Sequence, residues 1–302
     1  MLELFQEKRA ELARLISLPN PEEVQAWLKS RPRRAALLAR PALGARLNEG
    51  GGTEWFSVSQ AGKPSCSFLT LTNAGRGAAG GEAPPGARLA EEIEELRRLV
   101  QAWPGEWGLE LTGPDPRLAA EAAAAGGPLT WRGGPLETYF SLGRTGSLGA
   151  LVDTWAYVEG LAQLYGARGI QVHREIQGVR GTALMPPGLS VAVLLIEAAL
   201  AARGGSREVG LAYTPCGHLV QDGAAIRVLQ RMAPAGIKVS VTCLAWPGGA
   251  LAGFGGKAAA AAWTALTAAL GGGARAEVVT LDTAEDSWEE GLERLAAAGG
   301  VA

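Results

Sequence analysis

The residues of this chain that could do chemistry are mostly arginines and glycines that follow short apolar segments. Arg132 precedes two glycines, and Arg174 stands between His173 and Glu175. A third polar group, residues 213–218, contains one cysteine and one histidine. Glycines let a ligand approach the backbone closely. These residues predict an open site that suits a large flat ligand, and they give little sign of acid–base chemistry.

Motifs for metal binding and hydrolysis are missing from the sequence. The only histidines are His173 and His218, and neither belongs to an HxH or HExxH pattern. No GxSxG sequence marks a nucleophilic serine. The three cysteines, Cys66, Cys216 and Cys243, share no CxxC spacing and fit a reducing compartment. We therefore expect no metal site and no hydrolytic triad.

Several of these residues also have purely structural interpretations. Arg174 could pair with Glu175 or with a neighbouring strand end, and His218 could cap the helix that follows it. Cys216 could be a packed free thiol. Proline at a helix start is common, so the pair at 186–187 is best interpreted as the beginning of a helix.

The segments that must position these residues alternate between strand and helix patterns. Apolar segments rich in β-branched and aromatic residues predict strands at 54–59, 66–72, 107–112, 128–135, 169–175, 207–213, 237–245 and 276–281. Helical patterns fall at 87–102, 117–125, 148–167, 188–203, 222–232, 257–270 and 285–298. About eight strands alternating with helices favour an α/β fold of the (β/α)8 TIM-barrel type, whose site lies at the carboxyl ends of the strands.

The N-terminal region shows helical patterns alone, without the strand patterns of the rest of the chain. Residues 2–17, 21–30 and 34–48 predict three short helices. We therefore predict a helical segment over 1–50 and a barrel domain over 51–302.

Charge and hydropathy limit the partners that the chain could have. The net charge is −2, and no long cluster of lysine or arginine indicates nucleic-acid binding. The longest apolar run, about 192–202, contains Glu197 and is too short to span a bilayer. The charged N-terminus is unlike a signal peptide. We expect a cytoplasmic protein that binds neither nucleic acid nor membrane.

Four stretches of unusual wording carry a family resemblance: PDPRLAAEAAAAGG (114–127), GGPLETY (133–139), HREIQGVRGTALMPPG (173–188) and CGHLVQDGAAIRVL (216–229). They resemble the large (epsilon) subunit of coenzyme-B12-dependent glutamate mutase, also called methylaspartate mutase. The likeness runs from about Leu109 to the C-terminus and more faintly back to Glu22. The long C-terminal extension of that family is expected to be missing.

The resemblance implies adenosylcobalamin chemistry inside a closed barrel, namely a radical rearrangement of a carbon skeleton. In such enzymes a small subunit carries an Asp-x-His-x-x-Gly loop whose histidine ligates cobalt. This chain has no such pattern. The resemblance therefore implies that the cofactor is shared with a small cobalamin-binding partner subunit.

The resemblance also implies roles for individual residues. It assigns substrate contacts to Arg76, Arg132, Thr138 and Arg174, and cofactor contacts to Gly62, Asn73, Ile176 and Glu285. It identifies no catalytic residue, and residues 60–105 align ambiguously with the family.

Departures from the family indicate a different substrate. Of the three arginines that hold the carboxylates of glutamate, one is replaced by Gln60 and another by Leu111. Arg132 stands where the family has a glutamate that contacts substrate. Arginine binds carboxylates bidentately, so we expect poor binding of glutamate and binding of another small acid.

Three functions stay open at this point. The first is a divergent adenosylcobalamin-dependent mutase subunit. The second is a non-catalytic barrel that binds or chaperones a corrinoid protein, which the lost pocket residues favour. The third is a barrel enzyme with unrelated chemistry, such as a lyase. A corrinoid-binding partner would favour the first two, and turnover by the reconstituted pair would separate them.

Overall fold

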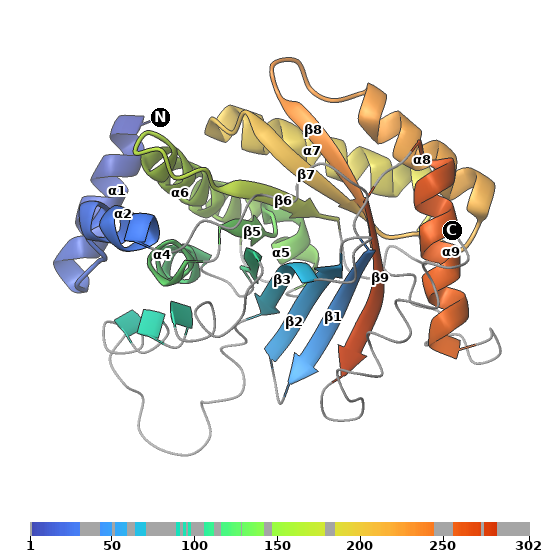
Figure 1. Ribbon diagram of the computed structural model, residues 1–302. Coiled ribbons are helices and arrows are strands. Elements are labelled where there is room, and N and C mark those ends of the chain that lie inside the picture. Colours follow the sequence, from blue (N-terminus) through green and yellow to red (C-terminus); the bar gives the residue numbers. More distant parts are fainter. Residues whose placement is uncertain are drawn as a thin grey trace.

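The strands of the protein form a closed barrel with helices along part of its outer surface (Figure 1). The computed structural model describes residues 2–30, 43–49, 52–58, 64–70, 89–90, 93–94, 96–97, 106–111, 116–127, 129–141, 147–178, 185–244, 256–272 and 275–282. The strands are β1 (Leu43–Glu49), β2 (Gly52–Val58), β3 (Pro64–Thr70), β4 (Glu106–Glu110), β5 (Thr130–Arg132), β6 (His173–Gln177), β7 (Glu208–Tyr213), β8 (Lys238–Cys243) and β9 (Arg275–Asp282).

Strand direction confirms the predicted α/β barrel and adds one feature to it. From β3 to β9 every neighbouring pair is parallel, and β9 closes the barrel by pairing parallel with β1. Strand β2 runs antiparallel to both β1 and β3. Among the described residues, β1 and β3 are thus connected through the antiparallel strand β2. In a regular (β/α)8 barrel a helix connects successive parallel strands.

The prediction of a third N-terminal helix over 34–48 is wrong for its second half. Residues 43–49 form β1, which pairs along its whole length with β2. Alanine, leucine and arginine favour a helix locally, but pairing with two neighbouring strands outweighs that preference. This strand lies on the N-terminal side of the boundary predicted at residue 50. The predicted helix 285–298 and the first half of 34–48 lie outside the described residues.

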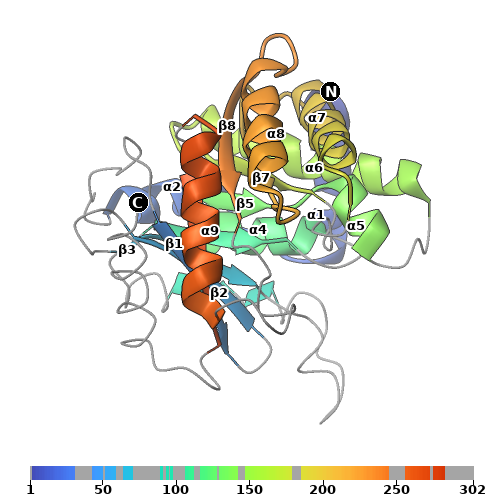
Figure 2. The same ribbon diagram turned by 90° about the vertical axis from the view of Figure 1, so that its right-hand side faces the viewer.

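The helices cover the outside of the barrel. They are α1 (Leu2–Leu15), α2 (Pro21–Ser30), α4 (Pro116–Gly126), α5 (Pro135–Ser141), α6 (Leu148–Gly166), α7 (Pro187–Gly204), α8 (Leu219–Arg231) and α9 (Gly256–Leu270). The sequence predicted all of these except α5, a short helix that begins directly after the two glycines at 133–134. Figure 2 shows α7, α8 and α9 side by side on one flank.

Two apolar clusters join the helices to the strands. In one, α7 and α8 pack against β6, β7 and β8; in the other, α1, α2, α4 and α6 pack against β4 and β5. Trp131, Ile176 and Leu211 lie in these clusters and therefore point outward. Successive side chains of a strand face opposite sides, so Arg132 and Glu175 face the barrel interior.

Helix α7 is long and apolar enough, by length and composition alone, to cross a membrane. Nearly half of it is buried, and its residues Val191 and Leu194 pack against β6 and β7. This packing is that of a core helix of a barrel.

Helix α1 is attached to the barrel through a close approach to α6. A methyl group added at Gly160 would lie 2.5 Å from the Phe5 ring, whose centroid is 5.1 Å from that of Tyr157. Beside this contact, Arg9 forms an ion pair with the buried Glu121 at 2.8 Å. Glycine at position 160 is thus what lets α1 pack this closely.

We predict that Gly160→Ala lowers the free energy of unfolding by about 1–3 kcal/mol, because the added methyl displaces Phe5. Helix propensity alone would predict a gain of about 1 kcal/mol. Gly149→Ala is the matched control in the same helix, since only Ser147 Oγ approaches that position, at 3.5 Å. Urea unfolding measures both variants. Equal stability of the two variants would contradict the proposed contact.

Candidate functional site

An ion pair occupies the barrel interior at β5 and β6. Arg132 and Glu175 are paired in register, and the guanidinium Nη2 donates to the Glu175 carboxylate. The two residues are 1% and 4% exposed. A buried pair of this kind needs both partners, because removing one leaves an uncompensated buried charge. The pair gives the interior a cation without giving it a net charge.

Beyond the pair, the interior faces of the next strands carry small or neutral side chains. Gln177 follows on β6, and Ala212 and Thr242 occupy the neighbouring positions on β7 and β8. Gly210 lies opposite Glu175, and a methyl group there would lie 2.9 Å from His173 Nε2 and 3.2 Å from the Glu175 Cγ. Glycine at this position therefore leaves room for the side chains of both His173 and Glu175.

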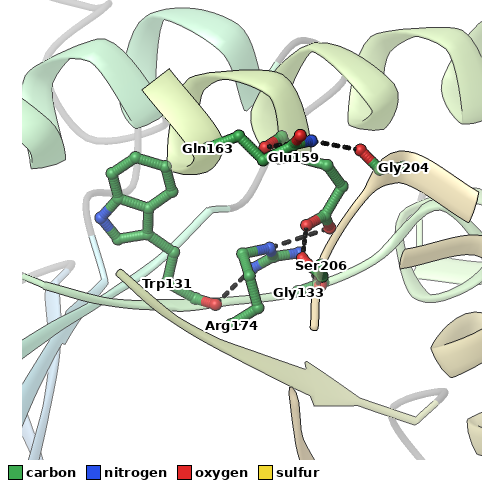
Figure 3. A network of polar contacts seen from close by, with 7 residues as sticks. All are labelled: Trp131, Gly133, Glu159, Gln163, Arg174, Gly204 and Ser206. Carbon is green, nitrogen blue, oxygen red and sulfur yellow. Dashed lines mark hydrogen bonds and ion pairs between the residues drawn. The ribbon is translucent and has the colours of Figure 1, made fainter. Parts of the chain in front are cut away.

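Arg174 has a different environment on the outer face of β6 (Figure 3). Its Nη1 donates to the Trp131 carbonyl, and its Nη2 donates to the Gly133 carbonyl at 3.0 Å. Its Nε donates to Glu159 of α6 at 2.9 Å, and Ser206 donates to the other oxygen of that carboxylate. All three nitrogens of the Arg174 guanidinium thus bond to the protein itself. Pairing at a neighbouring strand end was one structural interpretation of this residue from its sequence.

Thr138 closes the first turn of α5 beside this network. Its hydroxyl donates to the Gly134 carbonyl at 2.8 Å and accepts from the Trp155 indole at 3.2 Å. The Arg174 guanidinium lies over the same indole ring, 5.0 Å from the centroid. Thr138 and Arg174 therefore both contact Trp155, behind the loop at 133–134.

Glu197 of α7 holds the start of α5 from the other side. Its Oε1 accepts from the backbone N–H groups of Leu136 and Glu137, at 2.7 and 3.0 Å. A methyl group at Gly134 would lie 2.2 Å from Glu197 Oε2, so only glycine fits there. Burial raises the pKa of Glu197 to about 7; the two N–H groups and Arg174 oppose that rise.

A buried aspartate shapes the loop after β7. Asp222 accepts hydrogen bonds from the Tyr213 hydroxyl at 2.6 Å and from three backbone N–H groups, those of residues 216–218. His218 caps α8, as one interpretation of the sequence held: its Nδ1 accepts from the Gln221 N–H at 3.4 Å. Cys216 is a free thiol, and burial raises its pKa. Asp222 therefore fixes the backbone conformation of this loop.

The structure brings together some of the predicted site residues and separates others. Arg132 faces the interior. Arg174 and Thr138 lie behind the strand end, and Ile176 is buried in the apolar cluster beneath α7. Four predicted residues lie outside the described part of the chain: Gly62, Asn73, Arg76 and Glu285.

Sequence reasoning did not assign site roles to Glu159, Glu197 and Gln177. A signal existed for the first two, because each is an acidic residue flanked by apolar residues in a long helix. Buried charges in such positions are nearly always paired. For Gln177 the signal was its strand phase, since it alternates with Ile176 and so must face the opposite side.

Groups of three or more His, Cys, Asp or Glu residues able to hold a metal ion do not occur among the described residues. His173 begins β6, at the end of the strand opposite the mouth, and His218 serves as a helix cap. Neither histidine therefore belongs to a cluster of candidate metal ligands in the described part of the chain.

Fold and site together define an α/β-barrel protein with a charged pair and neutral polar groups inside, the architecture in which such barrels bind small ligands. A family model described as the methylaspartate mutase E chain matches residues 90–288. The chain belongs to this family. The matched region contains the interior pair of β5 and β6 and the loop after β7.

Curated relatives agree with this assignment. The glutamate mutase epsilon subunit of Haloarcula marismortui is 34% identical over 161 residues, which are 52% of this chain and 33% of the relative. That of Desulfitobacterium hafniense is 38% identical over 120 residues, which are 40% and 25% of the two chains. The match thus spans about a third or less of the length of these relatives.

One solved structure shows a weaker likeness. A phosphonomutase-like protein from Burkholderia cenocepacia J2315, described as putative, gives a TM-score of 0.42 at 18% identity, over 69% of this chain and 74% of that chain. A likeness of this size carries no conclusion.

We predict that Glu197→Gln removes part of the pH dependence of stability. The folded pKa of about 7 exceeds the ordinary value of 4.5, so the folded protein holds the proton between these values. Stability therefore falls as pH rises from about 4.5 to 7, by roughly 3 kcal/mol at most. Glutamine keeps the acceptor for both N–H groups and has no charge to bury.

The measurement is urea unfolding at several pH values between 4.5 and 8. Glu208→Gln is the control, because that residue is exposed and pairs with Lys238 on the surface. An unchanged slope in Glu197→Gln would contradict the assignment of this proton to Glu197.

Proposed function

We propose that this chain is the barrel subunit of an adenosylcobalamin-dependent carbon-skeleton mutase, an isomerase that acts on a small acid other than glutamate. The observation that carries this proposal is the family match over residues 90–288. It is supported by the buried Arg132, which provides a guanidinium in the barrel interior. Bound adenosylcobalamin supplies the radical chemistry, while the protein supplies orientation and exclusion of water.

Residues on the inner face of the strands bind the substrate, and residues behind the strands position the loop beside it. Arg132 binds the substrate carboxylate, and Glu175 holds the guanidinium in place. Thr138 and Arg174 act as positioning residues, because they fix the loop at 133–134 from behind. We keep Gly62, Asn73 and Glu285 as proposed cofactor contacts and Arg76 as a proposed substrate contact.

The cofactor is proposed to be shared with a small cobalamin-binding subunit that docks at the carboxyl ends of the strands. Helix α8 begins at that end, where Val220 is 73% exposed. An apolar side chain this exposed at the barrel mouth suits contact with a partner.

A second candidate function is a non-catalytic barrel that binds or chaperones a corrinoid protein. It is favoured by Leu111, which stands at a carboxylate-binding position of the family and is buried among apolar side chains. The pairing of Arg132 with Glu175 also favours it, because that cation is already neutralised inside the fold.

Purification of the tagged chain from its native host, in the dark, tests the proposal. We expect a small corrinoid-binding protein to co-purify and to give a corrinoid visible spectrum. Val220→Glu should reduce its capture at least tenfold, because a charge is placed in the docking surface. Met232→Glu is the matched control, at the opposite end of the same helix and 62% exposed.

A colourless chain without such a partner, still colourless after addition of adenosylcobalamin and candidate small subunits, would contradict both candidate functions. Turnover of a small acid by the captured pair separates the mutase from the non-catalytic barrel.

We further predict that Arg132→Met weakens binding of pentanoate about ten- to a hundredfold, because a charge-assisted hydrogen bond contributes roughly 1.5–3 kcal/mol. Calorimetric titration of the purified chain measures this. Arg203→Met, at an exposed position of α7, is the control. If the single variant does not fold, Arg132→Met combined with Glu175→Gln removes both buried charges together. Unchanged affinity would contradict the role of Arg132.

A further inference from the structure

We infer that Gln177 recognises a second, uncharged polar group of the substrate, so that the substrate is a small monocarboxylic acid that also carries a hydroxyl or carboxamide group. This inference rests on the proposed function, because it places the second group in the same barrel interior as Arg132. It concerns a residue to which the family resemblance assigns no role.

The position of Gln177 places its side chain inside the barrel. It is the last residue of β6, and Ile176 before it is buried in the outer apolar cluster. Its register partner is Ala212 of β7, which is followed by the outward-facing Tyr213. Gln177 therefore faces the interior at the carboxyl end of its strand, the end at which barrels bind ligands.

The carboxamide oxygen of Gln177 lacks a hydrogen-bond partner among the described residues. The residue is 5% exposed, and its Oε1 is buried without a hydrogen bond. Buried polar atoms are nearly always paired, and an unpaired one destabilises the folded state. Turning the amide over replaces an unpaired acceptor with an unpaired donor at the same place. A ligand with an O–H or N–H group would satisfy this oxygen.

The side chains on the strands beside Gln177 are small or neutral. Ala212 beside it has the smallest side chain after glycine, and Thr242 on the next strand is neutral. Gln177 lies two residues beyond Glu175 on the same face of β6, so their Cα atoms are separated by about 7 Å. That separation suits a ligand with a carboxylate near Arg132 and a polar group about four or five bonds away.

Charge decides which polar group fits. Arg132 and Glu175 together have no net charge, and Gln177 and Thr242 are neutral. A second carboxylate would therefore be desolvated in this described part of the interior without a compensating cation. A hydroxyl or carboxamide carries no such cost and donates a hydrogen bond to Gln177 Oε1. The site thus selects an acid with one charged end and one neutral polar end.

Calorimetric titration of the full chain with four five-carbon acids tests this selection. The probes are pentanoate, 5-hydroxypentanoate, glutaramate and glutarate, which differ only in the group at the far end. We expect glutaramate and 5-hydroxypentanoate to bind at least tenfold more tightly than pentanoate or glutarate.

Gln177→Leu should abolish the preference for the polar ends and leave pentanoate binding within threefold of wild type. Its melting temperature should be no lower than that of wild type, because leucine removes an unpaired buried amide. Gln171→Leu is the matched control, at an exposed position just before β6. It should leave all four affinities unchanged.

Two outcomes would overturn the inference alone: glutarate binding as tightly as glutaramate, or an unchanged preference in Gln177→Leu. In either case capture of a corrinoid partner would still support the proposed function. If none of the four acids binds, to the free chain or to the captured complex, the inference and the role of the barrel as a substrate site both fall.

Discussion

One buried guanidinium, that of Arg174, ties three layers of this protein together. It donates to backbone carbonyls at the end of β5, pairs with Glu159 on α6, and through that carboxylate reaches Ser206 between α7 and β7. Breaking such a buried pair by removing one partner typically costs about 3–5 kcal/mol. The path of the chain after β5, and with it the geometry of the interior pair, depends on this contact.

The candidate site is therefore formed by two groups of charges on opposite faces of the same strands. The inner pair presents a cation to the ligand, and the outer network fixes the backbone from which that cation projects. Glu197 completes the outer network by holding the first N–H groups of α5, at a distance that tolerates only glycine at 134. Substitutions on the outer face should thus alter binding without any contact with the ligand.

Much of this arrangement was accessible from the sequence, and the exceptions have physical causes. The barrel was predicted correctly from the alternation of strand and helix patterns, because the apolar segments that mark these elements are long and regular. Residues 43–48 were predicted to be helical, since local composition does not reveal pairing with β9. The family resemblance implied a substrate contact for Arg174, whereas its guanidinium bonds to Glu159 and to the Gly133 carbonyl. A strand pattern fixes which residues share a face, but only helix packing decides which face is inside.

The pairing of β1 with β9 has a consequence for how the chain folds. Leu43 is the register partner of Ala276, which lies more than two hundred residues later in the chain. The barrel can close only after β9 has left the ribosome, and long-range contacts of this kind form slowly. Until then, the charged and amide side chains of the interior remain in contact with water. The polar interior faces of the strands thus tolerate exposure to water before the barrel closes. The apolar outer faces do not, so they must pack against their helices early.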